Sequence, residues 1–275
     1  SLLKKRYWLL IMIVNIKYEN KYNERSLMPR ETEEIKIALL IPAYNEEKYI
    51  EGVIENSSKY EMDIIIIDDG SIDSTASIIE SLMPVYSPYL KLIRHTKNLG
   101  KGQALITGFD YIKENNYSGV ITLDADGQHD TREIIDFLEL IKKEDPDLII
   151  GDRLGNTAGM PFIRLATNVF TSWIISKIAG KKVSDVQSGY RYINAAALKK
   201  IKLKTKNFDT EPEIIFRAGW LDMKILNVPI KTIYHDDFVS YVNPVKDTIK
   251  FFKLVFNSLR WKREFRKQSS GDHVI

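Results

Sequence analysis

The chain has 275 residues, of which 44% are hydrophobic and 28% charged, a composition typical of a globular protein with a sizeable core. Its net charge of +3 is too small to indicate a nucleic-acid partner, and the absence of cysteine excludes disulfides and thiolate metal sites. We expect one large domain at residues 34–244, with an extension at 1–33 and a basic helix and tail at 245–275.

A short apolar run at residues 7–14 lies within the extension and follows three basic residues. It is much shorter than the roughly 20 residues that a membrane-spanning helix needs, and no small-residue cleavage site follows it. We therefore expect a segment that packs on the protein or lies on a surface. The chain as a whole is expected to be soluble or peripheral to a membrane.

Five apolar runs predict strands, because each is rich in β-branched residues and ends in polar ones. They cover residues 35–44, 63–69, 90–95, 119–126 and 147–152, and helical patterns lie between them at 46–60, 73–82, 101–115 and 131–143. Apolar runs without alternation are typical of strands that are covered on both faces. The pattern predicts an α/β fold with a mostly parallel, Rossmann-like sheet flanked by helices.

Polar residues follow each of these predicted strands. In open sheets of this kind, ligands bind beyond the carboxyl ends of the strands. Several of the residues also suit turns or helix caps, so no single one identifies a site. Together they would converge on one rim: Asn45, Glu46, Asp68, Asp69, Asn98, Asp124, Asp126, Asp152 and Arg153.

Asp124 and Asp126 give the clearest chemical signal on this rim. Side chains alternate along a strand, so both carboxylates would point to the same side. Two like charges repel unless something positive lies between them, and a divalent cation is the simplest candidate. Helix capping does not explain the pair, because Asp130 already stands at the start of the next predicted helix.

The segment GKGQAL at 100–105 opens a predicted helix, and its glycines would let the backbone approach a ligand. It lacks the third glycine of a dinucleotide-binding motif, and the sequence contains no P-loop motif. Both common nucleotide-binding folds therefore fit poorly.

Six motifs in this order resemble those of inverting family 2 glycosyltransferases of the GT-A fold: IPAYNE (41–46), IIIIDDGSIDST (64–75), NLGKGQAL (98–105), LDADGQH (123–129), IIGDR (149–153) and DVQSGYR (185–191). The most similar subgroup is that of the polyprenyl-phosphate (dolichyl-phosphate) sugar transferases, and the resemblance covers about residues 34 to 245. It implies metal-dependent transfer of a single sugar from a nucleotide sugar, GDP-mannose or a UDP-hexose, to a polyprenyl or dolichyl phosphate.

The resemblance also implies roles for individual residues on the donor side. The nucleotide sugar would be held by Pro42, Ala43, Tyr44, Glu46, Asp69, Lys101, Asp124, Ala125 and Asp126. Mg²⁺ or Mn²⁺ would be bound by Asp124, Asp126 and Gln128, which offer the oxygen ligands that hard cations prefer. For His129 we favour a packing role over a metal ligand.

On the acceptor side the resemblance implies phosphate contacts from Arg153, Arg164, Ser188 and Arg191, because the planar fork of arginine suits phosphate oxygens. Asp124, Asp126, Arg153 and Arg191 would form the catalytic group. Each arginine would otherwise be an ordinary structural ion pair. The loop near Ser240 departs from the subgroup, because Tyr241 stands where a basic residue is usual, and this leaves the acceptor contacts of that loop open.

The acceptor decides whether a general base is needed. A lipid monophosphate is already anionic near neutral pH, because its second ionisation lies at about 6, and it needs no base. A saccharide or protein hydroxyl would need one, and Glu211 or Glu213, or else Asp209, would then serve. Two other classes stay open: a haloacid-dehalogenase-type phosphatase, which leaves IPAYNE and DDGS unexplained, and a nucleotide-sugar sensor without catalysis.

The segment 245–267 has apolar residues at helical spacing and lysines and arginines on its other faces. This pattern predicts a basic amphipathic helix, which would either lie on an anionic membrane surface or pack against the domain. With the implied lipid acceptor, we expect a protein that binds peripherally at the cytoplasmic face of a membrane.

Overall fold

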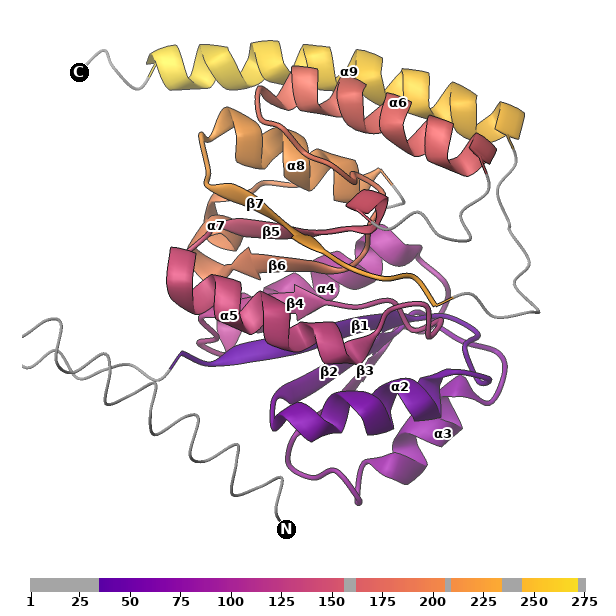
Figure 1. Ribbon diagram of the computed structural model, residues 1–275. Helices are drawn as coiled ribbons and strands as arrows, with labels where there is room; N and C mark the ends of the chain where they lie inside the picture. The colour runs from indigo at the N-terminus through magenta and orange to yellow at the C-terminus, as the bar shows by residue number, and fades with distance from the viewer. Residues whose placement is uncertain (1–34, 156–161, 206–208, 234–243, 272–275) are drawn as a thin grey trace, which may run out of the picture. The chain divides into compact units, whose positions relative to one another are not determined.

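The computed structural model describes residues 35–155, 162–205, 209–233 and 244–271, with side chains at 35–155, 165–205, 209–233 and 249–267. The extension at 1–33, its apolar run and the loop around Ser240 lie outside the described residues. The centre of the fold is a seven-stranded sheet in the order β3-β2-β1-β4-β6-β5-β7 (Figure 1). Its strands are β1 (Ile37–Ala43), β2 (Asp63–Asp68), β3 (Leu90–Arg94), β4 (Gly119–Thr122), β5 (Leu148–Asp152), β6 (Arg191–Asn194) and β7 (Ile225–Pro229).

The predicted mostly parallel sheet is confirmed. Strands β1, β2, β3 and β4 pair in parallel, as do β5 and β7. The exception is β6, which runs antiparallel between β4 and β5. The carboxyl ends of β1, β2 and β4 therefore meet at one edge, where the polar rim was expected.

Helices cover both faces of the sheet, so its strands are buried on both sides. One core cluster joins Leu40 and Ile65 to the helices α4, α6, α8 and α9, and the other joins Leu39 and Ile64 to α2, α3 and α5. This alternation explains why the strands read as unbroken apolar runs. The helices are α2 (Ile50–Ser57), α3 (Thr75–Leu82), α4 (Lys101–Glu114), α5 (Ile134–Glu144), α6 (Phe162–Ala179), α7 (Ala195–Lys200), α8 (Thr210–Trp220) and α9 (Pro244–Gly271).

The predicted strand at 119–126 is too long. Strand β4 ends at Thr122, and the two aspartates lie in the turn that follows it. This turn forms because the N–H of Gln128 donates to the Asp126 carboxylate at 3.0 Å and Gly127 adopts a left-handed φ of 70°. The pair is thus placed by a turn, and strand alternation does not explain its arrangement.

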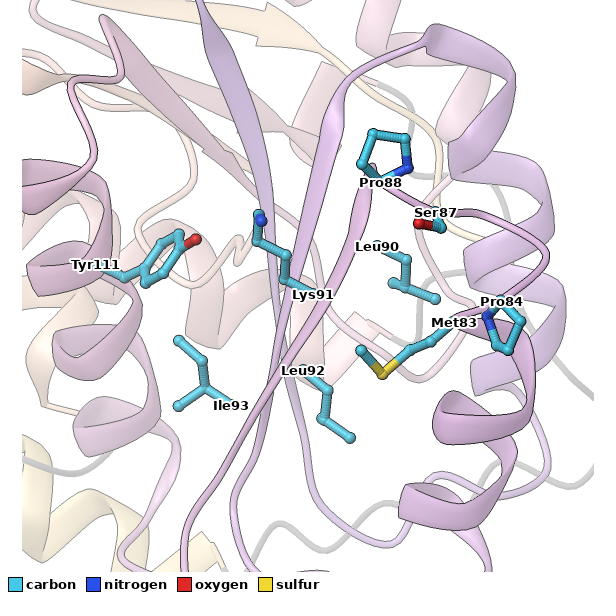
Figure 2. A pocket seen from close by; sticks show the side chains of 9 residues that line it. All are labelled: Met83, Pro84, Ser87, Pro88, Leu90, Lys91, Leu92, Ile93 and Tyr111. Carbon is cyan, nitrogen blue, oxygen red and sulfur yellow. The ribbon is translucent and has the colours of Figure 1, made fainter.

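A cavity of about 630 Å³ lies along the outer edge of β3, away from the polar rim (Figure 2). Lys91, Ile93 and Tyr111 line it on one side of the strand, whereas Leu90 and Leu92 lie on the other side (Figure 2). The cavity thus wraps an exposed sheet edge and offers one charged side chain, so it does not mark the site.

The contact between α6 and α8 requires a glycine at residue 219. A Cβ there would lie 2.4 Å from the carbonyl oxygen of Ala179, which ends α6. We expect Gly219→Ala to lower the free energy of unfolding by about 1–3 kcal/mol, because the two helices would have to move apart. Urea denaturation measures this change.

Gly52 is the matched control, because no atom lies within 4 Å of a Cβ built at this position in α2. Gly52→Ala should leave stability unchanged or raise it by about 0.5–1 kcal/mol, since alanine favours the helix. Equal losses in the two variants would contradict the close packing of α6 and α8.

Candidate active site

The loops after β1 and β2 form one hydrogen-bonded unit at the edge of the sheet. The N–H of Asn45 donates to Ser71 Oγ at 2.9 Å, and the N–H of Glu46 donates to Thr75 Oγ1 at 2.7 Å. In return, Asn45 Oδ1 accepts from the N–H of Ile72 at 3.0 Å. The IPAYNE and DDGSIDST motifs therefore build a single wall of the site, on which Pro42, Ala43, Tyr44 and Glu46 lie.

Asp69 organises the turn that leads into α4. Its carboxylate accepts from the N–H groups of Leu99 at 3.0 Å and Gly100 at 2.7 Å, and it lies 2.7 Å from His95 Nδ1. Gly100 has a φ of 94°, a conformation that glycine adopts without strain. Asp69 thus positions the glycine-rich segment. Its contact with the donor stays a prediction, and the part played by His95 was missed from the sequence.

The charge of Asp124 is balanced by a lysine from α4. Lys101 Nζ lies 2.7 Å from Asp124 Oδ1 and 3.1 Å from Glu211 Oε1, and His129 Nε2 lies 3.4 Å from Asp124 Oδ2. Burial opposes ionisation of Asp124, but the charge of Lys101 and the bond from His129 outweigh it and hold the pKa of this carboxyl well below its usual range. Asp124 is therefore an ionised and well-anchored group.

Asp126 is in the opposite electrostatic situation. Burial and the neighbouring charge of Asp124 raise the pKa of its carboxyl. The same field reaches Glu46, where burial together with Asp126 and Asp124 raises the pKa to about 7. Three carboxyl groups thus lie near one another, and ionising Asp126 and Glu46 is unfavourable because the nearby lysine is engaged by Asp124 and Glu211.

This crowding fits a divalent cation. Within the described ranges, no three His, Cys, Asp or Glu side chains lie close enough to form a metal site by themselves. Asp124 and Asp126 nevertheless offer hard oxygen ligands, and a cation would favour ionisation of Asp126. A cation held here would therefore take further ligands from a bound molecule.

Gln128 and His129 follow the acidic pair and are both nearly buried. The carbonyl of Gln128 accepts from the N–H of Ile233 at 2.9 Å, which ties the turn to the segment after β7. The ring of His129 lies 5.1 Å from that of Tyr190. His129 thus packs on an aromatic ring and also reaches Asp124, whereas the role of Gln128 as a metal ligand stays a prediction.

A glycine allows the segment 185–191 to approach Asp124. A Cβ at Gly189 would lie 2.5 Å from Asp124 Oδ1. Next to it, Ser188 is fully buried, and its Oγ has no hydrogen-bond partner among the described residues. The SGYR motif thus forms the floor beneath the acidic pair.

Arg153 and Arg191 hold this floor in place. Arg153 binds Asp185 through two bonds of 2.6 and 3.0 Å, and it is 7% exposed. Arg191 is 1% exposed, and its guanidinium donates to the carbonyls of Val186, Ser188 and Glu211. Asp185 had no role assigned from the sequence. Contacts of these arginines with an acceptor phosphate stay predictions, and the side chain of Arg164 lies outside the described residues.

The family model for glycosyl transferase family 2 matches residues 38–205, which include the wall at 41–75, the acidic pair and the segment 185–191, whereas Glu211 and the helices α8 and α9 lie beyond the match. The chain belongs to this family. It is therefore a glycosyltransferase, and the phosphatase alternative does not hold.

Relatives of this glycosyltransferase include a UDP-N-acetylglucosamine–dolichyl-phosphate N-acetylglucosaminyltransferase of Methanococcus voltae, 35% identical over 72% of this chain and 86% of the relative. The polyprenol monophosphomannose synthase of Mycolicibacterium smegmatis is 27% identical over 70% of this chain and 75% of its own.

The solved structure of glucosyl-3-phosphoglycerate synthase from Mycobacterium tuberculosis, with Mn²⁺, UDP-glucose and phosphoglyceric acid, matches at a TM-score of 0.58 and 18% identity. The match covers 88% of this chain and 86% of that one. At this identity it establishes the fold alone, and the predicted GT-A architecture is confirmed.

Two of the three candidate bases, Glu211 and Glu213, have different surroundings. Glu213 is fully buried and accepts bonds from Lys204, Thr205 and Arg217, so its carboxylate serves the structure. Glu211 instead faces Lys101 beside Asp124. Of the two, only Glu211 reaches the centre of the site.

The central ion pair gives a direct test. Lys101→Met would leave the Asp124 and Glu211 carboxylates unbalanced, and because these groups are only partly exposed we expect a loss of about 1–3 kcal/mol in the free energy of unfolding. Lys113→Met, which breaks a surface pair with Asp110 on the same helix, should cost about 0.5 kcal/mol or less. Thermal and urea unfolding measure both.

The difference in the free energy of unfolding between wild type and Lys101→Met should also depend on pH. Because the pKa of Asp124 is lowered by folding, its pairing stabilises the protein above the ordinary carboxyl value of 3.8, and this contribution is lost as the pH falls below it. The gap between wild type and Lys101→Met should therefore shrink in acid. A gap that widened there would show that Asp124 is not the group stabilised by Lys101.

Proposed function

We propose that this glycosyltransferase transfers one sugar, with inversion, from a nucleotide sugar to a polyprenyl or dolichyl phosphate. The observation that carries the proposal is the cluster of the Asp124, Asp126 and Glu46 carboxyl groups at one edge of the sheet, where Lys101 is bound to Asp124 and Glu211. Such a charge distribution suits a cation and a diphosphate at the carboxyl edge of the sheet. Two relatives named for lipid-phosphate sugar transfer support the choice of acceptor.

UDP-N-acetylglucosamine is the first donor to test, because the relative at 35% identity is named for it. GDP-mannose comes next, since other relatives are named for mannosyl transfer. A structural neighbour from Pyrobaculum calidifontis, with a TM-score of 0.50, holds GDP-mannose and Mn²⁺. In our proposal, the wall formed by Pro42, Ala43, Tyr44 and Glu46 faces the nucleoside.

Asp126, together with Asp124 and Gln128, would hold Mg²⁺ or Mn²⁺ in this proposal. When bound, the cation would stabilise the negative charge that develops on the departing diphosphate. Lys101 keeps Asp124 ionised and fixed in position. Asp69 fixes the start of α4 through two hydrogen bonds from the backbone, and this places Lys101 beside the acidic pair.

The acceptor phosphate would attack without help from a base, because its oxygen is already ionised near neutral pH. The buried arginines around residues 185–191 shape the floor on which it would lie, and Arg164 is expected to contact it. A nucleotide sugar is soluble and a polyprenyl phosphate is held in a membrane. The proposal therefore puts the protein peripherally at the cytoplasmic membrane face.

Asp126→Asn tests the donor half of the reaction. We expect it to lower sugar transfer at least about 100-fold, because the charge that holds the cation is removed. Asp136→Asn, at an exposed position of α5, is the control and should leave the rate unchanged. The assay follows labelled UDP-N-acetylglucosamine or GDP-mannose into dolichyl or undecaprenyl phosphate, with Mn²⁺ and after its removal by EDTA. Lipid-linked product that is independent of metal would contradict the proposal.

Glu211→Gln tests the acceptor half. With a phosphate acceptor we expect the rate to stay within about tenfold of wild type, because no base is needed, whereas a hydroxyl acceptor should lose about 10²–10⁴-fold. Transfer to a saccharide that requires Glu211, with no transfer to a lipid phosphate, would establish the hydroxyl alternative.

A further inference from the structure

Helix α9 has two apolar faces, and the domain covers one of them. Leu254 and Ser258 are buried, and Phe251, Val255 and Trp261 pack against the core cluster that also contains residues of α6 and α8. Further along the helix, the ring of Phe265 lies 6.0 Å from that of Trp220. Packing against the domain therefore accounts for this inner face.

The second apolar face of α9 points away from the domain. Ile249, Phe252, Phe256 and Leu259 are 63%, 56%, 72% and 48% exposed. Their spacing of three, four and three residues places them in a single stripe along the helix. An isolated exposed apolar residue needs no explanation, but a continuous stripe of four indicates a surface that binds something.

Helix α6 carries a second stripe of the same kind. Val169, Phe170 and Trp173 are 51%, 52% and 60% exposed and share one face of the helix. Helix α9 packs against α6, and the two lie side by side at one end of the sheet (Figure 1). We call the stripes on α6 and α9 together the outer apolar face. None of the helices that the structure describes is long and apolar enough to cross a bilayer.

Cations lie beside and beyond the apolar stripe of α9. The stripe of α9 continues, at the same helical spacing, into Arg263, Arg266 and Lys267, which are exposed. Lys253 and Arg260 flank it. The helix contains two acids, and Glu264 is paired with Lys204 at 2.6 Å and with Arg260 at 3.4 Å. The face is thus apolar along one half of α9 and cationic along the other.

A groove of about 580 Å³ lies beside the stripe of α6. Val169, Trp173 and Lys177 line it together with Leu154, which directly follows the buried Arg153. Both α6 and α9 begin on the side of the domain where β1 ends (Figure 1). The groove beside α6 therefore reaches the segment that follows β5 and carries Arg153.

We propose that the outer apolar face inserts into the interfacial region of an anionic lipid bilayer. Aromatic and aliphatic side chains flanked by lysines and arginines match the boundary between acyl chains and phosphate headgroups. A second copy of the chain is a poorer occupant, because it would bring two sets of cations together. The inference extends the proposed function by assigning the surface that meets the membrane, but its test does not depend on catalysis.

The test is flotation of the full chain with vesicles of phosphatidylcholine alone or mixed with phosphatidylglycerol, without donor or acceptor. We expect binding to the anionic vesicles that weakens with added salt. Phe252→Ser/Phe256→Ser should lower the partition coefficient at least about tenfold, because two exposed rings no longer enter the bilayer. Phe170→Ser/Trp173→Ser should lower it similarly.

The matched control is Val85→Ser/Tyr89→Ser, which removes two exposed apolar side chains near β3 and should leave binding unchanged. Thermal unfolding checks that each variant remains folded. Undiminished binding by the α9 variant would overturn the proposal and point to another segment, such as the apolar run at 7–14. A different outcome is a wild type that fails to bind vesicles and forms a dimer in sedimentation. If the α9 variant abolished that dimer, the face would join two copies of the chain.

Discussion

The arrangement of the site depends on the repulsion between two carboxylates in one turn. Asp124 and Asp126 lie two residues apart and are both substantially buried, so each raises the free energy of ionising the other. Lys101 on α4 balances the charge of one of them, because its Nζ lies 2.7 Å from Asp124 Oδ1. Among the described residues, no lysine or arginine forms an ion pair with Asp126. In the proposed function, the two identical residues therefore have different tasks: Asp124 is an anchored anion, and Asp126 is the group that would bind a cation.

Much of the surrounding structure holds Lys101 next to Asp124 and so maintains the different environments of the two aspartates. Asp69 holds the backbone at Gly100 and so sets where α4 begins and where Lys101 lies. From the other side, the bidentate pair of Arg153 with Asp185 and the carbonyl contacts of Arg191 fix the 185–191 segment. Gly189 lets that segment approach Asp124 without steric conflict. Buried arginines that bind the protein itself thus hold the 185–191 segment in place, and the proposed acceptor phosphate would then meet a fixed surface.

The sequence allowed five of the seven strands and the helices α2, α3, α4, α5 and α9 to be predicted, because buried parallel strands leave an unbroken apolar pattern with polar ends. Strands β6 and β7 were missed, since RYIN is short and contains an arginine, and ILNVP contains an asparagine and ends in a proline. The turn at Asp126 was missed as well, because the apolar run gives no signal of where hydrogen bonding to β1 ends. The partners of Lys101, Asp69 and Arg191 are distant in the chain, and no local pattern reports whether an arginine binds a ligand or main-chain carbonyls. The outer stripe of α9 was visible as amphipathic spacing, but its separation from the packed face required the exposure of each side chain.

The most direct test of the electrostatic account is an electron paramagnetic resonance titration of Mn²⁺ into the full chain in the presence of UDP or GDP. We expect a single tight Mn²⁺ site that disappears in Asp126→Asn and persists in Asp136→Asn. A tight site that survives the loss of the Asp126 charge, or a wild type that binds no Mn²⁺ with either nucleotide, would contradict the assignment of the acidic pair.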